Sequence, residues 1–361
     1  MLTSIEIKNF RGIRAMAETK LKRLNVFLGP NNCGKTSVLE SLFLLIGMSN
    51  PDLLFKIHSF RDLILTDEND LSYIFHNLDL QTLPFIRAKS NTGHADRSLE
   101  IKPISSTSAS YVKEKSMVQR VVPSSSAESA LSGLDFAFRT VTKGRTDNQH
   151  SFVHHVGEGR FNLQINKSYR ENILGIFVNS RSVSVSFYDR LEKLIVEKKK
   201  QLLIPIFQTV DSRIQDLSLG RNGMVFIDVG ASKLLPINVI GDGIRKVGSI
   251  LSALFSINDG ILLVDEIENG LHFETLKVLW KAVLANLADS KNQLFVATHS
   301  MECLLALKEA METDERKTVR SEFAAFSMNL DSQNTLKMYE YDFDKFAFSI
   351  TNSIEIRGGE F

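Results

Sequence analysis

Residues 25–36 read NVFLGPNNCGKT, and this short stretch decides the fold. The apolar run before Gly29 is typical of a buried strand, and apolar residues recur at helical spacing from Lys35 to about Ile46. The turn between them, Gly29–Thr36, fits the pattern G-x-x-x-x-G-K-[ST]. Strand, glycine-rich turn and helix in this order predict a loop whose backbone N–H groups surround phosphate oxygens at the positive end of the helix dipole.

The motif gives its members separate tasks. We expect Lys35 to reach the terminal phosphates of ATP and the Thr36 hydroxyl to hold Mg²⁺, so ATP and Mg²⁺ are the predicted cofactors. Cys33 lies beside the helix N-terminus, which is expected to lower the pKa of its thiol. The other predicted nucleotide-binding positions of the stretch are Gly29, Pro30, Asn31, Asn32, Gly34 and Ser37.

A second stretch, ILLVDEIENGLH at residues 261–272, supplies carboxylates. Four apolar residues predict a strand buried on both faces, and the strand leads directly into Asp265 and Glu266. Two adjacent carboxylates are costly to bury unless a cation lies opposite them. We therefore predict that Asp265 completes the Mg²⁺ site with Thr36 and that Glu266 polarises the attacking water.

Two further motifs complete the set. THS, residues 298–300, ends another apolar strand, and His299 is predicted to contact the γ-phosphate and the water, as a catalytic residue with Glu266 and Lys35. GDGIR, residues 241–245, is a second glycine-rich helix start and so a second candidate anion site. One phosphate cannot bind both helix starts of a subunit without close folding. A second subunit would solve this if its Gly241, Gly243 and Arg245 close over the first subunit's nucleotide.

These motifs, in this order, resemble the ABC-type ATPase heads of the RecF, SMC and OLD families. The closest resemblance is to the stand-alone OLD-like AAA ATPases of bacterial anti-phage defence, such as PARIS- and AbiL-like systems. IEIKNFRGI, residues 5–13, matches the start of these heads. The resemblance implies that Arg11 contacts nucleotide and that residues 268–272 form a D-loop at a dimer interface. It also implies a Q-loop near residues 179–181.

The GDGIR stretch takes the place of the signature motif of ABC-type heads, and it differs from the signature of transporter heads. Transporter heads have a serine where this chain has Gly241, so the γ-phosphate contact would come from backbone or from Arg245. No LSGGQ-like sequence is present, which disfavours a transporter ATPase.

The fold class expected is α/β: a P-loop NTPase of ABC-ATPase type, with a mixed central sheet, an antiparallel β lobe and a helical signature lobe. All 361 residues would form one head. Residues 1–180 would hold the P-loop and the antiparallel lobe, with polar Ser-rich loops at about 105–132, and residues 181–256 the signature lobe. Residues 257–361 would hold the Walker B strand, the H-loop and closing strands, with residues 336–350 read as a strand or hairpin.

Composition narrows the class of protein. Lys plus Arg is 43 and Asp plus Glu is 42, so the net charge of +1 gives no support for an overall basic nucleic-acid binder. Two cysteines argue against a disulfide scaffold. No apolar run approaches the roughly 18 residues needed to span a bilayer, so we expect a soluble cytoplasmic protein with no membrane partner.

The function expected from the resemblance is a homodimeric switch ATPase, or a higher oligomer of such dimers, in anti-phage defence. Because the chain has no recognisable effector domain, it would control a separately encoded nuclease or toxin in response to a nucleic acid or a phage protein. A RecF- or SMC-like ATPase of DNA repair or maintenance is the alternative.

Overall fold

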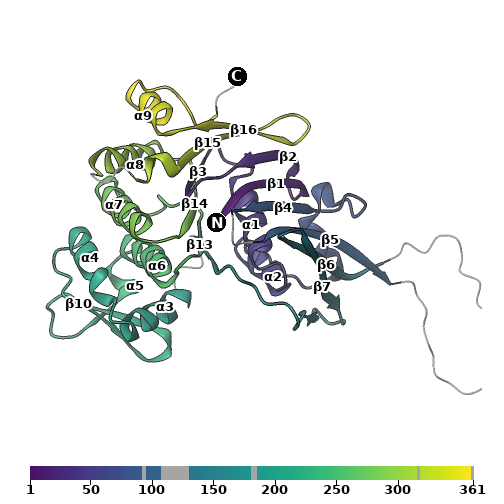
Figure 1. Cartoon of the computed structure of the whole chain (residues 1–361). Coiled ribbons are helices and arrows are strands. Elements are labelled where there is room, and N and C mark those ends of the chain that lie inside the picture. The colour runs from purple at the N-terminus through teal and green to yellow at the C-terminus, as the bar shows by residue number, and fades with distance from the viewer. Residues whose placement is uncertain (92–94, 107–129, 180–184, 315–317, 359–361) are drawn as a thin grey trace, which may run out of the picture.

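A mixed sheet of thirteen strands runs through the part of the chain that the computed structural model describes, residues 1–91, 95–106, 130–179, 185–314 and 318–358. Its strand order is β8-β7-β6-β5-β4-β1-β2-β16-β15-β3-β14-β13-β9 (Figure 1). The strands are β1 (Leu2–Phe10), β2 (Ile13–Lys20), β3 (Leu24–Leu28), β4 (Phe85–Ser90), β5 (Asp96–Ser106), β6 (Ala130–Thr142), β7 (Arg145–His155), β8 (Phe161–Gln164), β9 (Gly175–Val178), β13 (Ile261–Val264), β14 (Gln293–Thr298), β15 (Phe323–Leu330) and β16 (Thr335–Tyr341).

Helices cover both faces of the parallel part of this sheet. The α-helices are α1 (Lys35–Ile46), α2 (Asp52–Ser59), α3 (Val185–Val196), α4 (Ile204–Val210), α5 (Ile237–Ile240), α6 (Asp242–Ser256), α7 (Phe273–Asp289), α8 (Met301–Thr313) and α9 (Phe343–Thr351). Short 3₁₀ turns are η1 (Glu68–Ile74), η2 (His76–Leu78), η3 (Lys200–Leu202), η4 (Arg221–Gly223) and η5 (Arg320–Glu322). None of the described helices is long and apolar enough to cross a membrane.

Strand β13 is buried on both faces, as its apolar run predicts. Ile261 and Leu263 belong to the core on the side of α1, and Leu262 and Val264 belong to the core that contains Trp280 of α7. Strands β9, β13, β14 and β3 pair in parallel, so their carboxyl ends lie at one edge of the sheet. The segments that follow β3, β13 and β14 are therefore brought together there.

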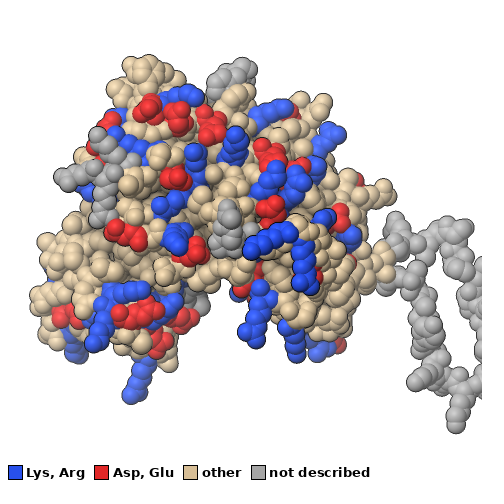
Figure 2. All heavy atoms as spheres, in the orientation of Figure 1, with Lys and Arg blue, Asp and Glu red and all other residues tan. Residues whose placement is uncertain are grey.

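The antiparallel strands β4 to β8 are confirmed, and they continue the central sheet rather than forming a separate one. Most of the Ser-rich stretch at 105–132 lies outside the described residues, and its described ends belong to β5 and β6. On the face shown in Figure 2, Lys and Arg are interspersed with Asp and Glu over most of the surface. This agrees with the near-zero net charge.

Two expectations about local structure were incomplete. The lobe expected to be helical also contains a three-stranded antiparallel sheet, β10 (Asp216–Leu219), β11 (Val225–Asp228) and β12 (Leu235–Pro236). The tail expected to be a strand or hairpin forms β16 and then α9. The Asp342 carboxylate accepts a hydrogen bond from the backbone N–H of Lys345, and this N-cap starts the helix. The apolar residues of this segment alternate with polar ones, a pattern typical of a strand, so the helix was not predicted.

Candidate nucleotide site

The predicted phosphate loop joins β3 to α1. Gly34 has a φ of +97°, a left-handed conformation that favours glycine, and it immediately precedes the helix. A Cβ on Gly29 would lie 2.9 Å from the carbonyl oxygen of Met328 on the neighbouring strand β15. Neither glycine can be replaced without moving the loop.

Lys35 lies under this loop. Its ammonium donates to the carbonyl oxygens of Gly29 and Pro30, at 2.7 Å each, and lies 3.8 Å from the Cys33 sulfur. The expectation for Cys33 is wrong: burial raises the pKa of its thiol, and this outweighs the attraction of the Lys35 charge.

The structure brings together the two predicted metal ligands. The Thr36 hydroxyl donates to Oδ2 of Asp265 at 2.9 Å, across 229 positions of sequence. The other oxygen, Oδ1, is buried and has no hydrogen-bond partner among the described residues. The pKa of Asp265 is raised to about 6, chiefly by burial. The charges of Glu266 and Glu40 contribute to the rise, and the Thr36 hydrogen bond and the Lys246 charge oppose it. A carboxylate with one unsatisfied oxygen and no adequate counter-charge fits a divalent cation.

A cavity of about 710 Å³ opens above these groups, within the size range of small-molecule sites. The predicted residues that line it are Arg11, Asn31, Asn32, Gly34, Lys35, Thr36, Ser37, Asp265 and Glu266. Glu266 has a φ of +47°, unusual for a residue other than glycine, and such strain is common at functional sites. His299, Gly241, Gly243 and Arg245 do not line the cavity.

A buried ion cluster that sequence reasoning missed lies below this cavity. Glu40 of α1 is fully buried and pairs with Arg11 at 2.8 Å and with Arg61 at 2.7 Å. Burial lowers the pKa of Arg11 to about 10, with Glu40 opposing the shift. Arg61 also lines the cavity, together with Tyr73. One signal was available: Glu40 is a lone acid within VLESLFLLI, the apolar part of the helix.

His299 lines a separate cavity beside the phosphate loop, not the nucleotide cavity, and its side chain is about half exposed. Its Nδ1 is 3.2 Å from Oε1 of Glu268, and its backbone N–H donates to the same oxygen at 2.9 Å. Glu268, expected at a subunit interface, thus orients His299 within its own chain. The Q-loop expectation is only partly described: Asn179 is buried, and residues 180–181 lie outside the described part.

The second glycine turn faces elsewhere. A Cβ on Gly243 would lie 3.1 Å from the carbonyl oxygen of Gly270, so this turn packs against the segment after Glu268. Arg245 is ion-paired with Asp242 and lines a separate small depression. Space around Gly241 is open to 4 Å.

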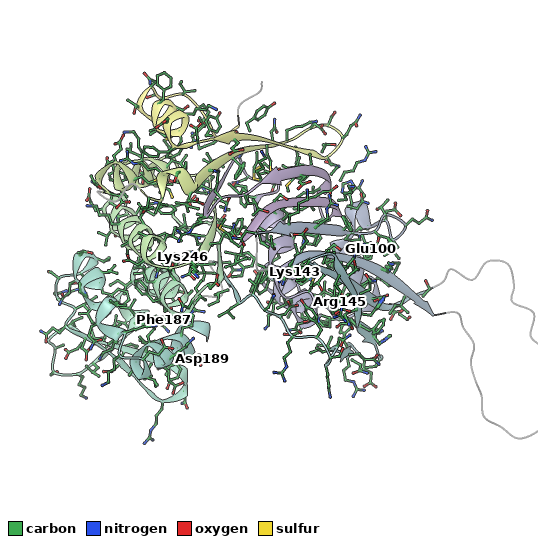
Figure 3. The ribbon with its side chains drawn as sticks, in the orientation of Figure 1. Glu100, Lys143, Arg145, Phe187, Asp189 and Lys246 are labelled. Atoms are coloured by element: carbon green, nitrogen blue, oxygen red, sulfur yellow. The ribbon has the colours of Figure 1, made fainter. Side chains whose placement is uncertain are left out.

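Lys246, also missed from the sequence, links this turn to the carboxylates. It is buried on α6, beside the central sheet (Figure 3), and its ammonium donates to the carbonyl oxygen of Asp265 at 3.2 Å. Burial lowers the pKa of Lys246 to about 8, and Asp265, Glu266 and Glu268 oppose the shift. The helix that carries the glycine turn is therefore in contact with the acid pair.

Known proteins resemble this chain in sequence or in structure. A protein described as an ATP/GTP phosphatase, from Helicobacter pylori, is 26% identical over 369 residues, which cover 94% of this chain and 96% of that protein. The SMC head bound to the C-winged helix domain of ScpA gives a TM-score of 0.51 at 11% identity, over 96% of this chain and 99% of that one. The SMC head domain from Thermotoga maritima gives 0.44 at 9% identity, over 94% and 98%.

The first of these structures confirms the predicted fold class: this chain is an α/β protein with a mixed sheet and the fold of an SMC head. Residues 1–304 match the family described as AAA ATPase domain. Because this match covers the phosphate loop, the acid pair and His299, this chain belongs to the AAA ATPase domain family.

Proposed function

We propose that this protein binds ATP between two copies of itself, hydrolyses it with Mg²⁺, and uses the cycle as a switch. The switch would control a separately encoded effector, a nuclease or a toxin, in bacterial anti-phage defence. The observation that carries the catalytic part is the Thr36–Asp265 hydrogen bond inside a cavity that Lys35 and Glu266 also line. The ATP/GTP phosphatase relative supports nucleoside triphosphate hydrolysis.

Each residue has a task that follows from its position. Thr36 and Asp265 would hold Mg²⁺, which when bound neutralises charge on the phosphates. Lys35 would exchange the loop carbonyls for phosphate oxygens. Glu266, one residue beyond Asp265 and lining the cavity, would orient a water and accept its proton. His299, held by Glu268 beside the phosphate loop, would contact the γ-phosphate and the attacking water.

The dimer is supported by the direction of the second glycine turn. Gly243 and Arg245 lie away from their own cavity, yet the turn begins α6 with open space at Gly241. An anion-binding helix start that does not serve its own phosphate loop is suited to the loop of a second copy. When a second copy binds at this turn, any shift of α6 would pass to Asp265 of the same chain through the Lys246 hydrogen bond.

The effector, and a nucleic acid or phage protein as trigger, rest on the resemblance of the motif set to defence ATPases. A RecF- or SMC-like ATPase of DNA repair or maintenance is the second candidate, because this chain has the fold of an SMC head. A nuclease or toxin gene adjacent to this one would favour the first candidate.

Two substitutions test the catalytic part. Lys35→Ala removes the phosphate-binding cation and should abolish tight ATP binding measured by calorimetry. Glu266→Gln keeps the shape but not the base, so ATP should still bind while turnover falls by about 10²-fold or more. Glu340→Gln, at an exposed position on β16, is the matched control and should behave as wild type. Wild-type affinity in Lys35→Ala, or normal turnover in Glu266→Gln, would contradict the proposal.

The switch is tested in cells. A host that carries the locus should resist phage, and Lys35→Ala should restore phage plating if ATP binding controls the effector. Glu340→Gln should leave resistance intact. Full resistance with Lys35→Ala would separate the ATPase from defence.

A further inference from the structure

The C-terminal segment 355–358 lies on the outer side of the phosphate loop. Its anchor is Ile356, whose side chain is completely buried in the core that also contains α8 and α9 residues. Gly358, with a φ of +90°, packs so closely that a Cβ there would lie 3.2 Å from Cδ of Pro30 and 3.3 Å from the carbonyl oxygen of Met328. The segment is thus fitted against the loop.

The cation in this segment is Arg357. Its Nη1 donates to the carbonyl oxygen of His299 at 3.1 Å, and its Nε donates to Glu355 at 2.8 Å. About a third of the Arg357 side chain is exposed. The guanidinium therefore contacts the backbone of His299 and keeps a solvent-facing side.

A second cavity, of about 320 Å³, lies between this segment and the loop. Asn31 lines both this cavity and the nucleotide cavity, so the two spaces lie on either side of that residue. Lys35 donates to the carbonyl oxygen of Pro30 from the inner side of the same loop. The residues that line the second cavity are Gly29, Pro30, Asn31, His299, Glu355, Arg357 and Gly358.

We propose that Arg357 recognises the terminal phosphate of a nucleoside triphosphate bound at the P-loop of its own subunit. This inference rests on the proposed nucleotide site. A planar guanidinium presents paired donors that match phosphate oxygens, and a triphosphate extends one phosphoryl group further along the loop than a diphosphate. In the structure Glu355 holds the guanidinium, and Arg357 lowers the pKa of Glu355 to about 2, so this competitor stays ionised at neutral pH.

The test compares ATP and ADP affinities by calorimetry in four proteins. Arg357→Gln should weaken ATP binding by about tenfold or more, the scale of a charged hydrogen bond to phosphate, and leave ADP binding unchanged. Glu355→Gln should tighten ATP binding, because it frees the guanidinium. Arg357→Lys keeps the charge without the fork and should recover part of the loss. A merely structural link between the tail and His299 would not produce opposite signs.

Lys35→Ala, measured in parallel, separates this inference from the proposed function. An unchanged ATP-to-ADP affinity ratio in Arg357→Gln, with binding lost in Lys35→Ala, would overturn the role of Arg357 alone. Equal weakening of both nucleotides would also overturn it. Equal ATP binding by wild type and Lys35→Ala would instead contradict the proposed nucleotide site at the phosphate loop. Should Arg357→Gln not fold, Glu355→Gln decides, because unchanged ATP affinity there contradicts the competition.

Discussion

Asp265 shows how the site conflicts with stability at the scale of one residue. It accepts one hydrogen bond from Thr36, has a buried oxygen without a partner, and lies beside Glu266. The Lys246 ammonium hydrogen-bonds the backbone carbonyl of Asp265, and its charge offsets only part of the cost of burying the carboxylate. The carboxylate is therefore poorly compensated by protein groups, which is the arrangement expected where a metal ion supplies the balance.

We predict that Asp265→Asn stabilises the protein in EDTA at pH 7.5. The pKa of Asp265 is about 6 in the folded protein, and its ordinary value is 3.8. Between these two values the folded protein keeps this carboxyl protonated while the unfolded chain has lost the proton. The contribution of Asp265 to stability is therefore most favourable below about pH 4, falls as pH rises through this window, and levels off above about pH 6. The amide removes a penalty of about 3 kcal/mol at pH 7.5, since each pKa unit corresponds to about 1.4 kcal/mol, and the gain should vanish below about pH 4.

Urea unfolding across pH measures this gain. Asp344→Asn, at an exposed position in the first turn of α9, is the control and should change stability by less than about 0.5 kcal/mol. A pH-independent change in Asp265→Asn would mean that burial of this charge is not what costs stability.

At the scale of elements, Arg97 fastens the antiparallel lobe to the end of the P-loop helix. This fully buried side chain comes from β5 and donates to the carbonyl oxygens of Leu45 and Ile46, at 3.2 and 2.9 Å, at the last turn of α1. It also donates to Asn172 at 2.8 Å and pairs with Glu171 at 3.3 Å. A cation at a helix C-terminus satisfies carbonyls that the helix leaves unpaired. The lobe and the phosphate loop are thereby joined through one rigid helix.

We predict that Arg97→Met lowers the free energy of unfolding by about 3 kcal/mol or more, because it leaves the partly buried Glu171 carboxylate and two carbonyls at the end of α1 without this donor. Lys102→Met is the control on the same strand: its ammonium is exposed and pairs with Glu100 at the surface. Surface pairs contribute about 1 kcal/mol or less. Equal denaturant midpoints for the two variants would show that Arg97 does not hold these elements together.

At the scale of the whole molecule, the phosphate loop and the second glycine turn lie in different surroundings. The phosphate loop opens into its own cavity, whereas Gly243 packs on Gly270 and Arg245 lines another depression. Two copies arranged face to face would bring the glycine turn of each to the cavity of the other. The closed unit would then contain two equivalent sites.

Mixing two inactive variants tests this arrangement. Gly243→Asp adds a side chain and a negative charge at the turn, and Lys35→Ala removes the phosphate-binding cation. A mixed dimer would contain one site made from two intact halves, so ATP hydrolysis should return on mixing if one sound site suffices. Labelled chains must show that subunits exchange. A normal rate for Gly243→Asp alone would mean that this turn never meets a nucleotide.

Elements that depend on a local pattern of residues could be predicted from the sequence. The helix Lys35–Ile46 and the doubly buried strand Ile261–Val264 were predictable because the spacing of apolar residues indicates which faces of an element are buried. The juxtaposition of Thr36 with Asp265 could also be anticipated, since parallel strands end at one edge of the sheet.

Only the tertiary structure decided the contacts between distant segments. Gln293 hydrogen-bonds the backbone of Leu2 from 291 positions away, and no local pattern encodes such a pairing. The same holds for Glu40 with Arg61 and for Arg357 with His299, whose meaning depends on burial and neighbours. Short strands such as β12 were missed because two residues carry no periodicity. The chemistry of a side chain limits which interactions it can make, and the sequence shows this chemistry directly. The fold decides which group lies opposite that side chain. Distance and burial then decide how strongly two charges interact.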